Sequence, residues 1–409
     1  MHSRNGVLCA ISLLALTSCV TFPNDSDYLL CDFDAHPISP PVASSSSTHK
    51  AREWLSTTAA ELRDCDERGA GLQPERFSLL SLSGGGPDGA FGAGFLAKII
   101  SRPTPGTFPF HPCIVTGVST GAVMGSYVYL ATSRNANISN RYLTELSALY
   151  PSLDDDALIK EYAWYELLPV PVSTYDVKGL RATLAKKVDE TLLQAVLEEY
   201  RTSHRRLWVG ATDLISKQFE IIDLTDFVAR HSGRLSDAHV QLCYQEAIRA
   251  SAAIPVLFPL VPILDRGFRK MYVDGGARYM MFMDATDLAQ LANGKELWIY
   301  GVINNTFYFA GDGAANPMNI FKTASLVSRI TADQLYLDSA FLVDSTAATA
   351  KAKRQWATPI GSVEALQCVR ENSSSKIFDP KYESCLQEAG SKKEKWDEVP
   401  PVVHPIPIK

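Results

Sequence analysis

The stretch Leu79–Ile100, LLSLSGGGPDGAFGAGFLAKII, decides the fold of this 409-residue chain. It begins with apolar residues typical of a buried β-strand, passes through a glycine cluster and continues into small and apolar residues typical of a helix. Two chemistries use such a glycine-rich turn between a strand and a helix. One binds the phosphates of a dinucleotide, and the other stabilises the negative oxygen formed during acyl transfer.

Further along the chain, short apolar strands alternate with helical segments. This alternation indicates an α/β fold with a mainly parallel central sheet that helices cover on both faces. The composition is that of a globular protein, and a net charge of -6 without a basic run argues against nucleic acid as a partner. The strand candidates that matter for a site are 77–83, 112–118, 205–214 and 269–274.

The dinucleotide interpretation fails one test. Gly84, Gly86 and Gly89 match the pattern Gly-x-Gly-x-x-Gly after a strand and before a helix. A dinucleotide-binding unit also places an acidic residue about 20 residues later, at the end of its second strand, to bind the ribose hydroxyls. The corresponding segment 101–117, SRPTPGTFPFHPCIVTG, contains no Asp or Glu. The cofactor interpretation therefore lacks one of its two required elements.

The second strand ends in GVSTG, residues 117–121, which is the Gly-x-Ser-x-Gly pattern of a nucleophile elbow. The serine of such an elbow lies in a tight turn between strand and helix. Gly117 and Gly121 on either side allow the neighbouring elements to approach closely. Ser119 would then lie at a helix N-terminus, where the helix dipole favours developing negative charge.

A serine nucleophile also needs an oxyanion hole and a base. Gly84, Gly85 and Gly86 have no side chains, so their amides can approach the oxyanion. The base is expected to be Asp274, because a strand delivers it and two glycines turn the chain after it; the common alternative is a plain Asp-Gly turn. Histidine is the usual base, but all eight histidines lie in flanking segments, a Pro-rich loop or polar stretches without a fixed strand end.

Five segments occur in the order and character found in the patatin-like phospholipase family: SLSGGGPDGAFGAG, GVSTGA, GATDLIS, AIRASAAIPVLFPLV and YVDGGA. The chain resembles this family over Phe77–Asn304, and its C-terminal stretch IFDPKYESCLQEAGSKKEKW resembles the tail of the bacterial lipoprotein branch. The resemblance implies a three-layer α/β/α fold and a Ser–Asp dyad without histidine, with Ser119 as nucleophile and Asp274 as general base. It also implies hydrolysis of acyl esters in lipids, of the phospholipase A or lysophospholipase type, with no metal or other cofactor.

Two other functions fit the same residues. An acyltransferase would use the same dyad with an alcohol as acceptor in place of water. A catalytically silent lipoprotein would use the fold as an interaction module, and the presence of the glycine loop, Ser119 and Asp274 argues against it. The sequence leaves head-group choice, chain length and oligomeric state open.

The glycine loop departs from the family at one place. The family often carries Arg or Lys just before the last glycine of the loop, where this chain has Pro87 and Asp88. Asp88 is expected to face solvent or to cap the helix that begins at Gly89. In the small-residue segment 250–255, Ser251 is expected to be structural, with a second polar group in the site as the alternative.

The N-terminus resembles that of a bacterial lipoprotein. Residues 1–18 have one Arg and a short apolar core, as in a secretory signal peptide, and the LTSC that ends at Cys19 resembles a lipobox. We expect cleavage before Cys19 and its acylation, which would anchor the chain in the cell envelope, and Val20 after it favours the outer membrane. The alternative is an ordinary cleaved signal with an incidental cysteine. Residues 19–75 would form an arm, whose Pro/Ser-rich part, 36–50, would keep the domain clear of the membrane.

Residues 76–310 are expected to form the catalytic domain, and 311–409 a helical region and tail that pack on it. The apolar positions of the long helix after residue 319 are expected to be core. Two aromatic clusters, Phe307–Phe309 and 161–176, are candidates for contact with an acyl chain or a membrane, although core packing is the commoner role for such residues.

The cysteines fit an oxidising compartment. None has the close spacing of a zinc site. Cys31 with Cys65, and Cys368 with Cys385, flank polar segments and could form disulfides. Cys113 and Cys243 lie in apolar elements and are expected to be buried thiols.

Overall fold

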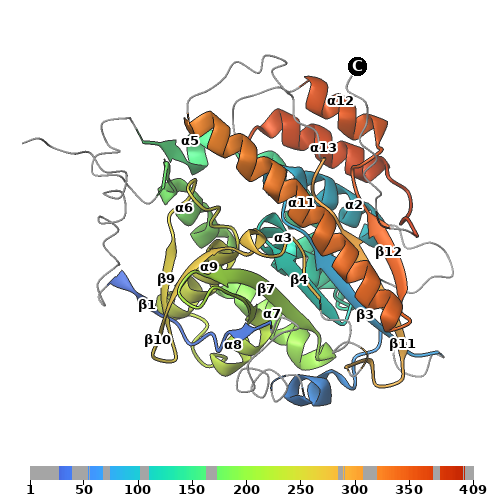
Figure 1. Cartoon of the computed structure of the whole chain (residues 1–409). Coiled ribbons are helices and arrows are strands. Elements are labelled where there is room, and N and C mark those ends of the chain that lie inside the picture. The colour runs from blue at the N-terminus through green and yellow to red at the C-terminus, as the bar shows by residue number, and fades with distance from the viewer. Residues whose placement is uncertain are drawn as a thin grey trace, which may run out of the picture.

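The strand predicted within the opening stretch is β3 (Arg76–Leu82) in the computed structural model of the chain (Figure 1). Phe77 and Leu79 belong to the apolar core on one side of the sheet, and Leu80 and Leu82 to the core on the other. Successive side chains of a strand point to opposite faces, so this apolar strand requires cover on both. The structure describes residues 27–38, 54, 56–67, 74–101, 110–162, 173–283, 289, 291–306, 320–371, 378–398 and 400, with side chains of 320–329 not described.

β3 lies near the middle of a ten-stranded sheet in the described part of the chain. The strand order is β1-β9-β10-β7-β4-β3-β11-β12, and β8 and β2 continue from β7. The strands from β7 to β12 in this order run parallel, whereas β10 is antiparallel to β7. Their bounds are β1 Leu29–Leu30, β2 His36–Pro37, β4 Ile114–Val118, β7 Arg206–Asp213, β8 Gln218–Asp223, β9 Val261–Asp265, β10 Phe268–Asp274, β11 Glu296–Val302 and β12 Lys353–Ala357, with the separate pair β5 Lys160–Glu161 and β6 Tyr175–Asp176.

Helices cover both faces of this sheet, so the fold is a three-layer α/β/α fold with a mainly parallel centre. α2, α3, α4, α7, α9 and α13 contribute to the core on one face. On the other face lie α11, which crosses the sheet in Figure 1, and the short helix at 56–62. The bounds are α2 Gly89–Ser101, α3 Thr120–Ala131, α4 Ala136–Leu149, α5 Asp155–Leu158, α6 Lys178–Lys187, α7 Glu190–Ser203, α8 Leu224–Arg230, α9 Ala238–Ser251, α11 Ile320–Thr349, α12 Val363–Glu371 and α13 Pro380–Lys392, with short 3₁₀ turns η3 Gly86–Asp88, η4 Tyr150–Ser152 and η5 Gly275–Ala277.

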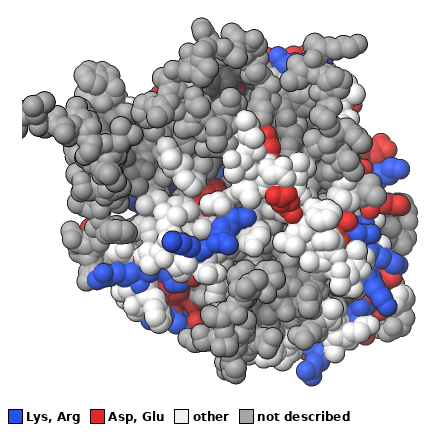
Figure 2. All heavy atoms as spheres, in the orientation of Figure 1, with Lys and Arg blue, Asp and Glu red and all other residues white. Residues whose placement is uncertain are grey.

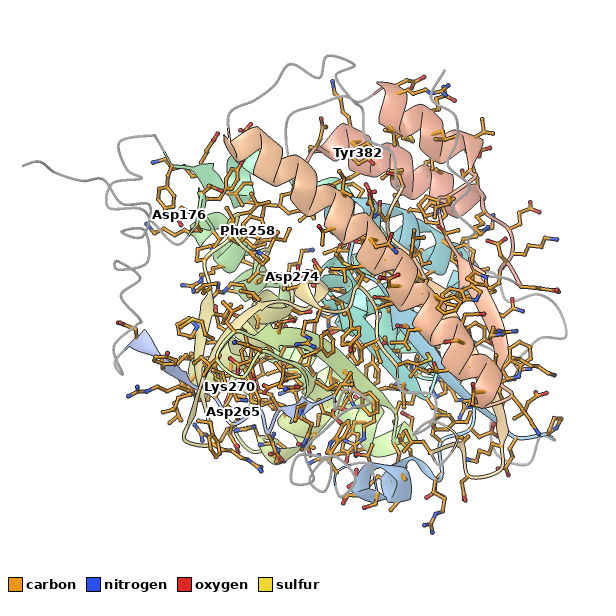
Figure 3. All side chains as sticks on the ribbon, viewed as in Figure 1. Asp176, Phe258, Asp265, Lys270, Asp274 and Tyr382 are labelled. Atoms are coloured by element: carbon orange, nitrogen blue, oxygen red, sulfur yellow. A yellow bond between two sulfur atoms is a disulfide. The ribbon has the colours of Figure 1, made fainter. Side chains whose placement is uncertain are left out.

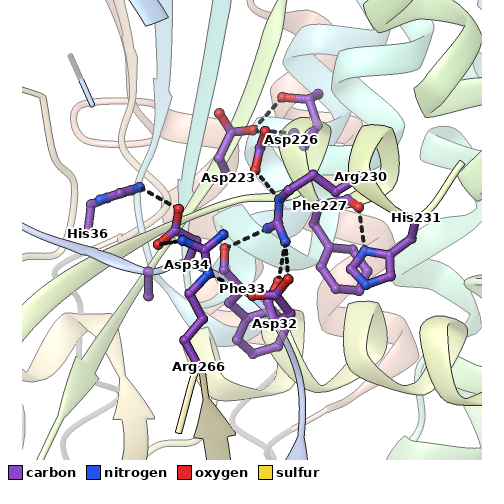
Figure 4. Close-up of polar contacts among 12 residues, drawn as sticks. Asp32, Phe33, Asp34, His36, Asp223, Asp226, Phe227, Arg230, His231 and Arg266 are labelled. Carbon is purple, nitrogen blue, oxygen red and sulfur yellow. Dashed lines mark hydrogen bonds and ion pairs between the residues drawn. The ribbon is translucent and has the colours of Figure 1, made fainter. Parts of the chain in front are cut away.

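The segment 27–38, which lies within the predicted N-terminal arm, packs on the domain. β1 pairs with β9, and β2 pairs with β8. Asp32 makes ion pairs with Arg230 and Arg266, both at 2.8 Å (Figure 4). The amides of residues 33–35 donate to the buried carboxylate of Asp265 at 2.8–3.0 Å. Backbone pairing and charge therefore fix this segment to the sheet edge.

Two of the predicted cysteine assignments are wrong. The disulfides are Cys31–Cys243, Cys65–Cys113 and Cys368–Cys385, so only the last agrees with the prediction. Cys31 and Cys65 do not pair, and Cys113 and Cys243 are not free thiols. The reason is long-range: β1 joins the sheet beside α9, and residues 56–62 pack where β4 begins. Local sequence around each cysteine does not reveal such neighbours.

Charged side chains of both signs are mixed among the described residues on the face shown in Figure 2. Within the described residues, we find no helix with the length and hydrophobicity needed to cross a membrane. The predicted signal peptide, Cys19, the cluster Phe307–Phe309 and most of the cluster 161–176 lie outside the described residues. These remain predictions, as do the proposed domain boundaries.

Candidate active site

Ser119 lies between β4 and α3, in the tight turn that its glycine-bordered sequence predicts. Its backbone has φ 53° and ψ −121°, a conformation that residues other than glycine rarely adopt. The amide of Ser119 donates to the backbone oxygen of Ser251 at 3.1 Å and to its Oγ at 3.0 Å. Ser251 Oγ in turn donates to the Gly210 carbonyl at 2.6 Å. The strained turn is therefore held by α9 and β7, and Ser251 has the structural role expected for it.

Gly121 allows α3 to begin directly against β3. A Cβ at this position would lie 2.3 Å from the carbonyl oxygen of Leu82, which no side chain could tolerate. The first turn of α3 is thereby packed against the strand that leads into the glycine loop. Ser119 and the loop are neighbours for this reason.

Asp274 is the last residue of β10 and caps η5. Its Oδ1 accepts a hydrogen bond from the Gly276 amide at 2.7 Å, and its own amide donates to the Ala253 carbonyl at 2.8 Å. The sequence alternative of a plain Asp-Gly turn would leave this side chain in water. Instead it is buried, with 5% of its surface exposed.

The register of β7 brings the ends of β4 and β10 together. Val118, immediately before the serine, pairs with Gly210, and Asp274 pairs with the next residue, Ala211. Ser119 and Asp274 are 155 positions apart by their residue numbers, yet they flank one strand at the same edge of the sheet. Open α/β sheets place ligands at this carboxyl edge of their parallel strands.

Burial raises the pKa of Asp274 to about 6 from its ordinary value of 3.8, although hydrogen bonds from the Ser119 hydroxyl and the Gly276 amide lower it. Asp274 Oδ2 is buried and makes no hydrogen bond of regular geometry within the described residues. Ser119 therefore makes no regular hydrogen bond to this oxygen, which is common for catalytic pairs before substrate binds. An orphaned carboxylate oxygen beside a strained serine is chemically poised to take a proton.

The glycine loop adjoins Ser119. A Cβ built on Gly84 would lie 3.3 Å from Ser119 Cβ. Gly85 has φ 148°, and a Cβ there would lie 1.6 Å from the Asn304 carbonyl oxygen, so only glycine fits. The Gly84 amide already donates to the Met280 carbonyl at 2.8 Å. In the described part of the chain, the amides of Gly85 and Gly86 make no hydrogen bond and can serve a ligand.

A family model described as patatin-like phospholipase matches residues 80–287, about half of the chain. The chain belongs to the patatin-like phospholipase family. The solved structure of VipD from Legionella pneumophila is similar at 14% identity and a TM-score of 0.30, covering 78% of this chain and 66%, just under two thirds, of VipD. No match was found among curated proteins.

The matched patatin region includes the glycine loop, Ser119 and Asp274, and the three-layer fold predicted from the resemblance is confirmed. The family supports a lipid acyl ester as substrate. None of the described histidines makes a hydrogen bond to Ser119 or Asp274. Four of them have other polar partners, and the fifth lies at the C-terminus of α7: His36, His111, His231 and His239, and His204. Among the described residues, no group of three or more potential metal ligands is arranged to hold an ion.

Asp88 differs from the prediction that it faces solvent or caps α2. Its Oδ1 accepts a hydrogen bond from the Tyr382 hydroxyl at 2.6 Å. Its Oδ2 accepts from the amide of Thr306 at 2.9 Å and from the Thr306 hydroxyl at 3.0 Å. Burial raises the pKa of Asp88, and these hydrogen bonds oppose the rise. The prediction failed because both partners lie more than 200 residues away in the sequence.

Two site neighbours escaped the sequence analysis. Tyr336 on α11 places its hydroxyl 3.4 Å from the Cβ position of Gly84, and Met280 Sδ lies at the same distance. Burial and the nearby Asp274 raise the pKa of Tyr336. Tyr336, Ala340, Val343 and Ala347 recur at helical spacing and are buried, as predicted for this helix. The prediction is wrong for Ile330, Phe341 and Leu342, which are exposed on the same helix. That spacing could have marked Tyr336 as inward-facing, but not as a neighbour of the glycine loop.

Proposed function

We propose that this patatin-like protein is a lipid acyl hydrolase with Ser119 as nucleophile and Asp274 as general base. The observation that carries the proposal is the register of β7, which brings a strained serine and a buried, partly unpaired carboxylate to one sheet edge. A nucleophile and a base that lie close together at a strand end form the minimal apparatus of covalent acyl transfer. Asp274 is labelled at the centre of Figure 3.

In the proposed reaction, Asp274 takes the hydroxyl proton of Ser119 while Oγ forms a bond to the ester carbonyl carbon. The amides of Gly85 and Gly86 donate to the resulting oxyanion. The alcohol then leaves with the proton held by Asp274, and an acyl-serine remains. A water molecule, deprotonated by Asp274, attacks this ester, releases the fatty acid and returns the proton to Ser119.

The pH dependence of activity follows from the raised pKa of Asp274. Asp274 must be ionised to accept a proton, and its pKa is about 6. We expect kcat/KM to be level above this pH and to fall about tenfold for each pH unit below it. The measurement is the initial rate of a soluble aryl ester between pH 4.5 and 8.5. A profile level down to pH 4.5 would contradict the assignment of Asp274 as the base.

An apolar cavity leads away from Ser119 between α3, α6 and α9. Its walls include Val123 and Tyr127 of α3, Leu184 of α6, and Ile248 of α9. Phe258, labelled in Figure 3, also lines it. The cavity holds only about 80 Å³, less than the roughly 300–1,000 Å³ of typical ligand sites. We infer that it accepts one acyl chain as its flexible apolar side chains move apart.

Leu184→Trp is expected to slow the hydrolysis of long-chain esters much more than that of short-chain esters. Leu184 is half-buried in the cavity wall, so a larger ring would fill space that a long acyl chain needs. We expect kcat/KM for a dodecanoyl ester to fall at least about tenfold, because the long chain loses apolar contacts in the cavity. The kcat/KM for a butyryl ester should remain within about twofold of the wild-type value. Equal losses for both esters would contradict the cavity as the acyl site.

The reaction class is tested by product analysis on vesicles of phosphatidylcholine and phosphatidylglycerol. Hydrolysis yields free fatty acid and lysophospholipid in equal amounts. If an added alcohol captured most of the acyl groups at low concentration, the protein would be an acyltransferase. If the wild-type protein released no acyl group from any ester, the proposed function would be wrong and a silent interaction module would be favoured.

The membrane location is a separate proposal that rests on acylation of Cys19. The first described residue, Asp27, lies eight positions after Cys19, and β1 follows directly. Eight residues span at most about 29 Å, so an anchored chain would hold the domain close to the lipid surface. The segment 36–50 would then not act as the spacer predicted from the sequence, because residues 29–30 before it and 36–37 at its start already pair with the sheet. Cys19→Ser should move the protein from the membrane fraction to the soluble fraction, and an unchanged distribution would contradict the anchor.

A further inference from the structure

The segment 304–306, which follows β11, holds the glycine loop at both ends. Before the glycines, Ser83 Oγ accepts a hydrogen bond from the Asn304 amide at 2.8 Å, and the Ser83 carbonyl accepts from Asn304 Nδ2 at 2.9 Å. After the glycines, Asp88 accepts the two hydrogen bonds from Thr306. The residues that bear the free amides, Gly85 and Gly86, lie between these two attachments.

Asp88 also makes a hydrogen bond within the glycine loop. Its amide donates to the Gly85 carbonyl at 3.1 Å, which fixes the orientation of the peptide between Gly85 and Gly86. The direction of the Gly86 amide depends on this peptide, because a peptide unit is planar. A shift of Asp88 would therefore rotate a donor that the proposed oxyanion hole uses.

The second anchor of Asp88 comes from the C-terminal helix. Tyr382 lies in the first turn of α13, which packs along α2, the helix that follows the loop. The disulfide Cys368–Cys385 joins α13 to α12 one turn further on. Lys98 of α2 donates to the Ser391 carbonyl of α13 at 3.3 Å. Tyr382 is thus a fixed donor, and Figure 3 shows it on α13, apart from Asp274.

We propose that Asp88 is a positioning residue, and that through Tyr382 and Thr306 it holds the Gly85 and Gly86 amides in the geometry that binds the oxyanion. This inference rests on the proposed role of those two amides. It gives the C-terminal helix, which lies outside the matched family region, a part in catalysis. It also gives Asp88 a function at the position where the family often has a basic residue.

The test compares Asp88→Asn and Tyr382→Phe with wild type. In either orientation, Asn turns an amide nitrogen, which cannot accept, toward Tyr382 or toward Thr306, so at least one of the three hydrogen bonds that Asp88 accepts is lost. Phe removes the Tyr382 hydroxyl and leaves the contacts of Thr306 in place. We expect kcat for a butyryl aryl ester to fall about tenfold to a hundredfold in each variant, with KM within about twofold. Because Tyr382 is proposed to act through Asp88, the double variant should be little worse than the worse single variant.

Tyr200→Phe is the matched control. It also removes a tyrosine–carboxylate hydrogen bond, to Glu61 at 3.1 Å, but on α7 away from the loop. We expect wild-type kcat for it. A loss of thermal stability with unchanged kcat in Asp88→Asn and Tyr382→Phe would overturn the inference, because it would show a structural role only.

Amide hydrogen exchange separates this inference from the proposed function. The peptide that contains residues 83–88 should exchange faster in Asp88→Asn and Tyr382→Phe than in wild type or Tyr200→Phe, whether or not the protein hydrolyses esters. Unchanged exchange in this peptide would overturn the inference even if the enzyme is active. Faster exchange in a protein without esterase activity would show that the loop is held as argued while the proposed function is wrong.

Discussion

Ser119→Ala is expected to lower ester hydrolysis at least about a thousandfold, to the level left by binding and the oxyanion hole alone. The reason is that the tight turn holds the Ser119 hydroxyl, the proposed nucleophile, beside the glycine loop and the Asp274 carboxylate. The measurement is kcat/KM for butyryl and dodecanoyl aryl esters. The fold should persist, because the alanine keeps the backbone hydrogen bonds that the Ser119 amide makes to Ser251.

Ser147→Ala provides the control for this variant. Ser147 is exposed on α4, and its hydroxyl bonds only the Leu143 carbonyl of its own helix at 2.9 Å. Its activity should equal that of wild type. Loss of a nucleophile leaves far less than about a tenth of the activity. If Ser119→Ala retained more than that, another group would have to attack the ester.

Asp274→Asn has the second large expected effect. An amide cannot take the hydroxyl proton, so kcat should fall about a thousandfold to ten-thousandfold while KM changes little. The side-chain oxygen of the new amide could still accept the hydrogen bond of the Gly276 amide, so the loss would reflect proton transfer rather than a broken turn. Asp237→Asn, which changes a partly exposed cap of α9 that Asn also serves well, should keep wild-type activity.

The same substitution of Asp274 should stabilise the fold in a pH-dependent way. The folded pKa of Asp274 is raised, so the folded state holds its proton more firmly, and wild-type stability falls as pH rises from about 4 to about 6. Above this window the ionised, buried carboxylate costs the folded state up to about 3 kcal/mol, from the difference between about 6 and 3.8. Urea unfolding of Asp274→Asn should show this gain at pH 8 and little of it at pH 4. A less stable variant at pH 8 would contradict the burial argument.

Most of the fold could be predicted from local pattern. The apolar run that forms β3 is buried on both faces. That its successive side chains enter the cores on opposite sides of the sheet follows from the geometry of a strand and can be predicted from the sequence. The division of residues 177–203 into α6 and α7 is harder to predict, because it depends on one capping residue in the middle of the stretch. Asp189 accepts the Leu192 amide at 3.0 Å and begins α7, so the stretch forms two helices.

The positions of Ser119 and Asp274 at strand ends could be predicted, because a motif and a strand end coincide there. The groups that arrive from distant sequence could not. Tyr382 reaches Asp88 from a separation of 294 residues, and Cys243 reaches Cys31 from 212. A lone aspartate after a glycine cluster has no local feature that distinguishes a solvated side chain from one held by another helix. The engagement of the Gly84 amide by Met280 is likewise a property of the fold.

The pH-dependent reaction of Ser119 with a fluorophosphonate tests the central claim most directly. We predict that peptide mass spectrometry of the wild-type protein will find one phosphonyl adduct, on Ser119. Its rate of formation should fall below a pH of about 6, with the ionisation of Asp274. The rate should be lower throughout in Asp274→Asn. An adduct on another residue, or a rate on Ser119 that is the same in wild type and Asp274→Asn at every pH, would contradict the Ser–Asp dyad.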